Sequence, residues 1–264
     1  MTEFSSLLKK GAIDSFFIFA ATTGVRFSFI LALFVLSIWL PNEDIARYDI
    51  FVVTSSVLLI LFTFGLDSGL ATVAQSSNAR ENSTLLCAAL AIVLAAAVFL
   101  YFPLVYLVSR FGIAGVIDVA MFKMAYFLAG SNSLVLIVFS YFRWSGQALV
   151  ASVLVTIGNT VGFAVAFFIF YLERTVDGFL IGLLVGGFLT SLLVGFYLMR
   201  TVRLPRNMSL VNDVVPVAIS LVRVGVPYGV ASAALMARRP FERVAILSFG
   251  DPALLGAYAL VSRF

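Results

Sequence analysis

Histidine is absent from this sequence of 264 residues, and cysteine occurs once, as Cys87. The first absence excludes histidine as an acid, a base or a metal ligand. A single cysteine excludes a disulfide within the chain and argues against a thiolate metal cluster. Because neither paired carboxylates nor a G-x-x-x-x-G-K-[ST] phosphate loop stands out, we expect no enzyme, no ATP-driven transporter and no cofactor.

Charged residues are scarce as well. They make up 11% of the chain, against about 25% in soluble domains, while apolar residues reach 62%, against about 45–50%. With a mean hydropathy of +1.11, this composition predicts an integral membrane protein with several spans. The net charge of +4 comes from cations that are not clustered in a soluble domain, so we expect no nucleic-acid partner.

The apolar segments predict an all-α membrane fold. Within the hydrocarbon core every backbone polar group must be paired inside the protein, which leaves helices and closed barrels. Barrel strands alternate apolar and polar residues, whereas Leu85–Val108 and Gly178–Met199 are apolar all round. The first apolar stretch, Gly11–Leu40, is too long for the core of a cleavable signal peptide.

Six segments have the length of about 17–25 residues that suits a hydrocarbon core about 30 Å thick. They are Ala12–Ile38, Tyr48–Leu66, Leu85–Val108, Val119–Phe142, Ala148–Leu172 and Gly178–Met199. A seventh, Ser220–Gly250, contains Pro227 and Pro240. An eighth begins near Ala253 and has room for about 18 Å of helix, too little to cross. We therefore interpret the chain as a fragment that ends inside a span.

This order of spans predicts three parts. Residues 1–199 form a six-helix transmembrane lobe, 200–219 a basic cytoplasmic linker, and 220–264 the start of a second lobe. The basic residues of the short loops favour a cytoplasmic N-terminus. In that orientation seven lie inside and three outside; the inner ones are Lys9, Lys10, Arg80, Arg143, Arg200, Arg203 and Arg206, and the outer ones Arg47, Arg110 and Arg174.

An internal repeat supports a second lobe of the same orientation. Phe34–Val53 resembles Val244–Arg263, with Tyr48 matching Tyr258 after a one-residue gap. Each segment forms a helix–loop–helix corner on the same side of the membrane. A parallel repeat of this kind relates two lobes by an axis along the membrane normal.

Arg26, near the midpoint of the first span, is the strongest signal of a function. An arginine at that depth costs ~2.5–3.5 kcal/mol on insertion scales, and more if it faces lipid. The repeat places it beside Arg238. Polar residues on one face of its helix form a stripe: Ser15, Thr22, Arg26 and Ser37. We expect this stripe to face a hydrated cavity; the alternative is a structural ion pair of Arg26 with Asp14 or Asp67.

A second cationic cluster surrounds Pro240 and consists of Arg238, Arg239, Glu242 and Arg243. Three arginines against one glutamate predict positive charge that is not compensated. A helix broken by proline at membrane depth is tolerated only against protein or a water-filled cavity, so we expect the cluster to line a cavity. The alternative is that Ser220–Ala237 is a complete short span and that the cluster forms a loop.

Two other charges lie close to span ends. Lys123 is about one turn inside the fourth span, where it either reaches the outer interface or lines the cavity with Tyr126. Asp67, between Gly65 and Gly69, either takes part with Glu242 in proton or sodium coupling or pairs with a basic group. No metal site is expected.

Small and polar residues predict close packing of the later helices. Ser152, Thr156 and Asn159 follow one face of the fifth span and predict interhelical hydrogen bonds of ~0.6 kcal/mol each. Gly182, Gly186 and Gly187 predict a close helix contact in the sixth.

Two runs resemble signatures of bacterial polysaccharide flippases of the Wzx type. The run WLPNEDIARYDIFVVTSSVLLILFTFGLDSGLATVAQ, at Trp39–Gln75, has a proline–acidic loop, an aromatic corner and a phenylalanine–glycine–leucine turn. The run Val224–Leu260 resembles the seventh-to-eighth-helix signature, with an acidic–arginine pair at Glu242 and Arg243 and a glycine–aromatic corner that ends at Tyr258. The resemblance implies a truncated transporter of the multidrug/oligosaccharidyl-lipid/polysaccharide exporter superfamily, with about 12–14 helices in two lobes.

The resemblance also implies a function. Such flippases move undecaprenyl-diphosphate-linked oligosaccharide across the bacterial inner membrane by alternating access, for the synthesis of O-antigen, capsule or exopolysaccharide. Guanidinium groups match phosphate oxygens in pairs, and the expected cationic cavity comprises Arg26, Arg238, Arg239, Arg243 and Lys123. Expected partners are the lipid-linked substrate, the bilayer and the polysaccharide polymerase or chain-length machinery. The alternatives are a cation-coupled multidrug exporter of the same fold and a non-transporting scaffold of a glycan-synthesis complex.

Overall fold

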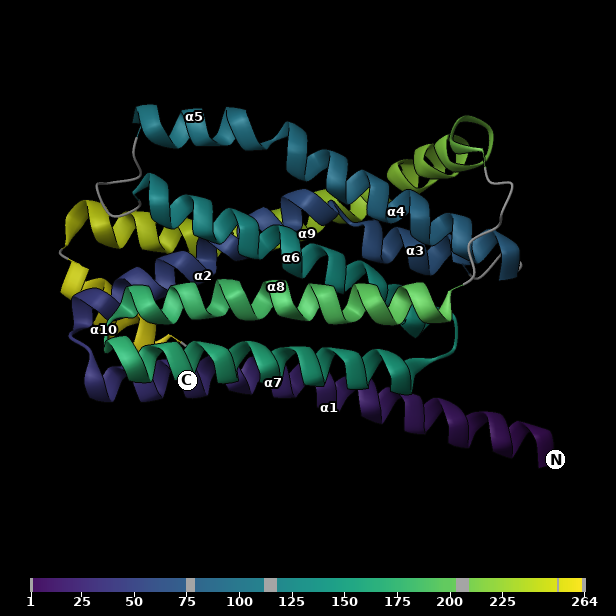
Figure 1. The fold of residues 1–264 in the computed structure, drawn as a ribbon, viewed down its shortest axis with the longest axis horizontal. Coiled ribbons are helices and arrows are strands. Elements are labelled where there is room, and N and C mark those ends of the chain that lie inside the picture. Colours follow the sequence, from purple (N-terminus) through teal and green to yellow (C-terminus); the bar gives the residue numbers. More distant parts are fainter. Residues whose placement is uncertain (1, 75–78, 112–117, 203–208, 251, 263–264) are drawn as a thin grey trace.

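The structure, a computed structural model, describes residues 2–74, 79–111, 118–202, 209–250 and 252–262, and the regular elements within these ranges are all helices. In chain order they are α1 (Thr2–Trp39), α2 (Asn42–Thr63), α3 (Leu66–Ala74), α4 (Ala79–Phe99), α5 (Tyr101–Phe111), α6 (Val119–Trp144), α7 (Ala148–Glu173), α8 (Val176–Thr201), the short π-helix η1 (Leu210–Val214), α9 (Val215–Phe249) and α10 (Pro252–Val261). The helices run side by side along one axis, as Figure 1 shows.

The predicted membrane class is confirmed. Within the described ranges seven helical segments are long and apolar enough to cross a membrane, which is the pattern of a multi-pass membrane protein. Two of them consist of two helices each, α2 with α3 and α4 with α5. The predicted linker is shorter than expected, because α9 already begins at Val215. The predicted linker residues Arg203 and Arg206 lie outside the described residues.

The helices turn at two ends of the bundle. We call "corner end" the end that holds the α1–α2 and α9–α10 connections, on the left of Figure 1, opposite the N-terminus. The two corners touch, since a Cβ on Gly256 of α10 would overlap the backbone of Asn42 at the start of α2. The prediction that both repeat segments form corners on one side of the bundle is therefore confirmed.

The α2–α3 break lies at the closest approach of α9. Phe64 and Gly65 both have left-handed backbone conformations, with φ of 38° and 77°, so the helical ladder stops there. Glycines of α9 face this break: a Cβ on Gly229 would lie 2.6 Å from the carbonyl oxygen of Phe64, and one on Gly225 3.1 Å from that of Gly65. The absence of side chains thus lets the two backbones touch.

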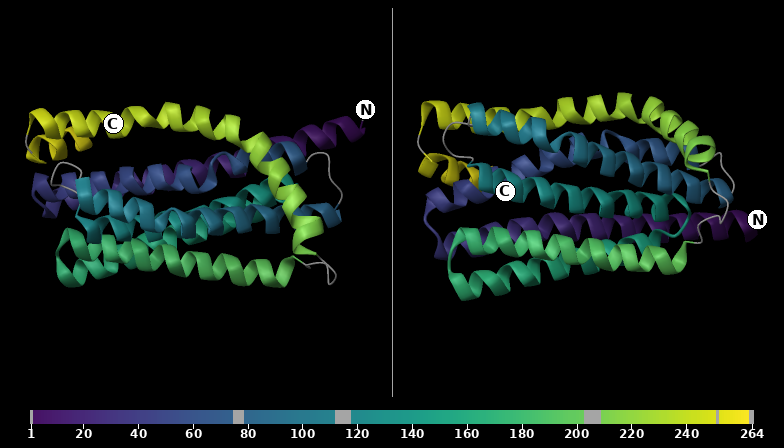
Figure 2. Two further views of the ribbon diagram at one scale, coloured as in Figure 1. Left: turned by 90° about the horizontal axis from the view of Figure 1, so that it is seen from above. Right: turned by 45° about the horizontal axis from the view of Figure 1, so that its top comes forward.

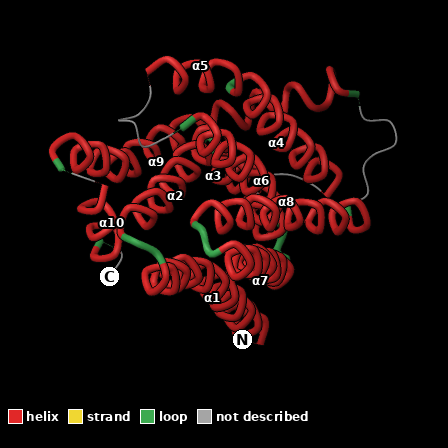
Figure 3. Tube along the Cα trace, turned by 60° about the vertical axis from the view of Figure 1, so that its left-hand side comes forward, coloured by secondary structure: helices red, strands yellow, loops and turns green. Residues whose placement is uncertain are grey.

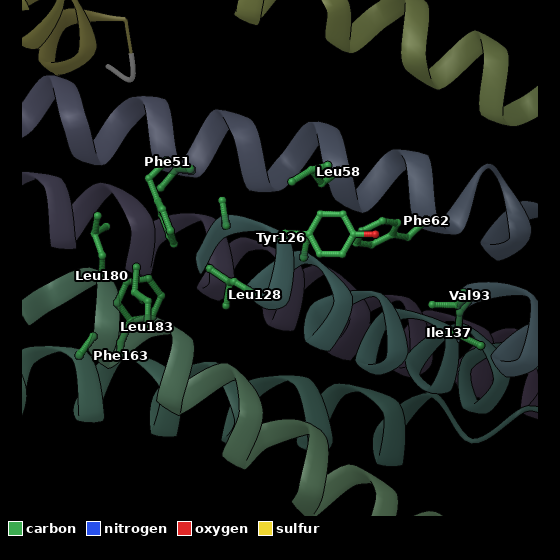
Figure 4. Packing of buried hydrophobic residues seen from close by; sticks show 14 of the residues in the cluster. Phe51, Leu58, Phe62, Val93, Tyr126, Leu128, Ile137, Phe163, Leu180 and Leu183 are labelled. Carbon is green, nitrogen blue, oxygen red and sulfur yellow. The ribbon is translucent and has the colours of Figure 1, made fainter. Parts of the chain in front are cut away.

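Helix α6 lies at the centre of the bundle, where it contacts α2, α3, α4, α5, α7 and α8, as the view in Figure 3 shows. Tyr126 of α6 is buried, stacks edge-on against Phe62 of α2 at 4.9 Å between ring centroids (Figure 4), and donates a hydrogen bond of 2.5 Å to the carbonyl oxygen of Ala97. It is therefore a core residue rather than a neighbour of Lys123 in a cavity.

The α7–α8 contact has the predicted small-residue packing. A Cβ on Gly186 would lie 2.7 Å from the carbonyl oxygen of Gly162 on α7. Asn159 donates a hydrogen bond of 2.9 Å to Ser28 of α1, which confirms an interhelical role for that member of the polar stripe. Thr156 is exposed instead.

We predict that Gly186→Ala lowers the free energy of unfolding by about 1–3 kcal/mol, because the added methyl group forces α7 and α8 apart. Denaturant titration in detergent micelles measures the change. Gly195→Ala, also on α8, is the matched control: its Cβ meets no atom within 4 Å, so stability should stay equal or rise by up to about 1 kcal/mol. Equal losses in both variants would contradict close packing at Gly186.

Candidate functional site at the contact of α2, α9 and α10

Helix α9 passes through the cationic cluster without interruption. Its 35 residues include Pro227 and Pro240, and the alternative that the cluster forms a loop is wrong. Each proline removes a backbone donor, which permits bending. Figure 2 shows the bend: the light-green first part of α9 crosses the end of the bundle, and the yellow part runs along it toward the corner end.

The centre of the site is a buried ion pair that joins α9 to α2. Arg243 Nε lies 2.8 Å from Asp49 Oδ2, and Arg243 Nη2 lies 3.4 Å from Asp49 Oδ1, so the guanidinium donates to both carboxylate oxygens. The two residues keep only 6% and 0% of their surface exposed. In such a dry setting neither charge is tolerated without the other.

Glu242 connects this pair to its surroundings. Its carboxylate accepts a hydrogen bond from Arg238 Nε at 2.5 Å and another from the Tyr258 hydroxyl at 2.8 Å, and it lies 3.6 Å from Arg243 Nη1. The Tyr258 ring also lies 5.6 Å from the Arg243 guanidinium carbon. Since Tyr258 belongs to α10, the network joins three helices at the corner end.

The predicted excess of positive charge is therefore smaller than expected. Asp49 neutralises Arg243, and Glu242 neutralises Arg238. Sequence reasoning missed Asp49, which lies directly after the aromatic corner residue Tyr48 in the first repeat segment. A signal was present: a carboxylate one turn or more inside an apolar helix needs a cation, and Arg243, directly before the second repeat segment, supplies one.

The other predicted site residues are not gathered in this network. The side chains of Arg26 and Arg239 lie outside the described residues, although both positions are in described helices. Lys123 is exposed in the second turn of α6, which agrees with a reach to the interface. Asp67 is half-buried in the first turn of α3, and among the described residues it makes no ion pair.

Next to the ion pair lies an apolar cavity of about 360 Å³ between α2, α5, α6 and α9. Thr54 and Arg243 carry the polar groups of its wall, and the other lining residues, among them Val57, Phe122 and Leu247, are apolar. Of the residues predicted to line a cationic cavity, Arg243 lines this one, whose wall is mostly hydrocarbon. The hydrated cationic cavity stays a prediction.

Comparisons of the chain with protein-family models, curated proteins and solved structures yield no match. Its function is therefore argued from its own residues.

We predict that Asp49→Asn lowers the free energy of unfolding by about 3 kcal/mol, since the buried guanidinium then loses the negative charge that neutralises it. Thermal and denaturant unfolding in detergent measure the loss. Arg47→Ala is the control, because its ion pair with Asp177 is partly exposed and should contribute less than about 1 kcal/mol. The double variant Asp49→Arg/Arg243→Asp, which exchanges the two charges, should recover part of the loss. Similar losses of unfolding free energy in Asp49→Asn, Arg47→Ala and the double variant would refute a buried pair.

Proposed function

We propose that this chain belongs to a flippase for lipid-linked oligosaccharide in the bacterial inner membrane, with its N-terminus in the cytoplasm. One observation carries the proposal: the Arg238 side chain is 84% exposed although it lies 11 residues before the end of α9, about 17 Å along the helix. A guanidinium at that depth is not stable against hydrocarbon. This face of α9 must therefore meet water or further protein.

The first lobe has an arginine at matching depth. Arg26 lies 13 residues before the end of α1, about 20 Å along its helix, measured from the same corner end. Ser15 and Thr22, on the same helix face, are exposed, so that face is not packed against the described helices. Two arginines from different lobes, near mid-membrane depth, suit a diphosphate headgroup that crosses the bilayer.

The contact between α9 and α2 suits alternating access. Transport by that route needs a contact between the lobes that forms in one state and opens in the other. The Asp49–Arg243 pair joins α9 to α2 at the corner end, and water that enters when the lobes separate can solvate both charges in place of their dry contact. A cation-coupled exporter remains the second proposal, because the Asp67 carboxylate is not engaged in an ion pair among the described residues.

We predict that Arg26→Ala and Arg238→Ala each reduce surface glycan on the order of tenfold or more in cells that produce the complete protein, since a charge-assisted phosphate contact is lost. The lysine variants should retain part of the display, because lysine keeps the charge but not the paired geometry. Glycan is quantified on whole cells, with the protein level measured in parallel.

Arg200→Ala is the matched control, as Arg200 lies in the last turn of α8 at the membrane interface, and we expect normal display. Unchanged glycan in both Arg26 and Arg238 variants would reject the phosphate-binding role. Loss of drug resistance without a glycan defect, as a result of Asp67→Asn, would favour the exporter. Normal glycan display in cells, together with no transport of the lipid-linked oligosaccharide by the purified protein in reconstituted vesicles, would favour the scaffold.

A further inference from the structure

The apolar cavity beside the ion pair is elongated along the bundle axis. Its lining residues on α5, α6 and α9 fall within about 14 Å of the helix ends at the corner end, whereas those on α2 reach Leu61, about 28 Å from the start of that helix. A hydrocarbon core measures about 30 Å. The cavity therefore lies at the depth of the lipid chains.

The wall of the cavity favours hydrocarbon over water. Its polar groups are Thr54 and the guanidinium of Arg243, and the guanidinium is bonded to Asp49. Apolar cavities of about 150 Å³ stay dry and bind small hydrocarbons, and this cavity is larger, about 360 Å³. An unfilled space of that size would forfeit the dispersion contacts of every lining side chain.

The cavity is accessible from the bilayer. Leu107 of α5 and Val244 of α9 line it, yet they keep 47% and 41% of their surface exposed. The mouth is therefore between α5 and α9, at the level of the membrane-spanning segments, where the surrounding medium is lipid chains.

We propose that this cavity binds one acyl chain of a membrane phospholipid. The chain enters between α5 and α9 and fills the space against α2 and α6, while its headgroup stays at the membrane surface. It packs against the aliphatic stem of Arg243 and so shields the Asp49–Arg243 pair from water. This site is independent of the flippase function.

Photolabelling of the complete protein in lipid nanodiscs tests the proposal. The probe is phosphatidylethanolamine with a diazirine in one acyl chain, used at a low fraction of the lipid, and labelled residues are mapped by mass spectrometry. We expect residues 53–61 of α2 to be labelled severalfold more than Phe168, an exposed residue of α7 that reports ordinary lipid contact. Equal labelling of residues 53–61 and Phe168 would overturn the proposal. So would labelling of residues 53–61 by a headgroup diazirine to the same extent as by the acyl-chain diazirine.

A cavity-filling variant supplies the second arm. Val57→Trp should reduce labelling of 53–61 severalfold, whereas Val153→Trp on the exposed face of α7 should leave it unchanged. Undiminished labelling in Val57→Trp would also count against the site. In a Cys87→Ser background, Thr54→Cys should resist a charged thiol reagent; rapid modification would mean a water-filled cavity and end the proposal.

Discussion

The buried pair of Asp49 and Arg243 is the constraint on which the arrangement at the corner end depends. A carboxylate and a guanidinium that are almost fully enclosed must stay together, because separation in the dry interior would leave two uncompensated charges. The pair fixes the rotation of α9 about its own axis. That rotation in turn decides which α9 side chains face the cavity and which face away from α2.

The glycine contact gives α9 a second fixed point. Gly225 and Gly229 touch the α2–α3 break through backbone atoms, more than ten residues before Arg243. The glycine contact sets the distance between α9 and the α2–α3 break, since any side chain would push the helices apart. The ion pair sets the rotation of α9 and its position along the bundle axis. Between these two points lie lining residues of the apolar cavity, among them Val57 and Leu61 of α2 and Pro240 of α9. A rocking movement of the lobes would have to separate the charged contact, while the apolar glycine contact can act as a pivot.

The fold class could be predicted because composition and segment length decide it. The seven spans follow from apolar runs whose length matches the membrane. The break at Phe64 could not be placed, because the predicted second span, Tyr48–Leu66, runs across it as one apolar segment. The Asp49–Arg243 pair could not be predicted for a different reason: the two partners are 194 residues apart in the chain. Long-range pairing depends on how helices are placed, and periodicity carries no such information.

Helix α9 has two faces of opposite character. At 100° per residue, Pro240, Val244 and Leu247 fall on one side, while Arg238 and Glu242 fall about 180° away. The first side lines the hydrocarbon-walled cavity, and the second carries the exposed guanidinium and the bond to Tyr258. Arg243 lies toward the first side, yet its guanidinium reaches Asp49 and approaches Glu242. One helix thus presents an apolar face to the cavity and a charged face to Tyr258 at the same depth.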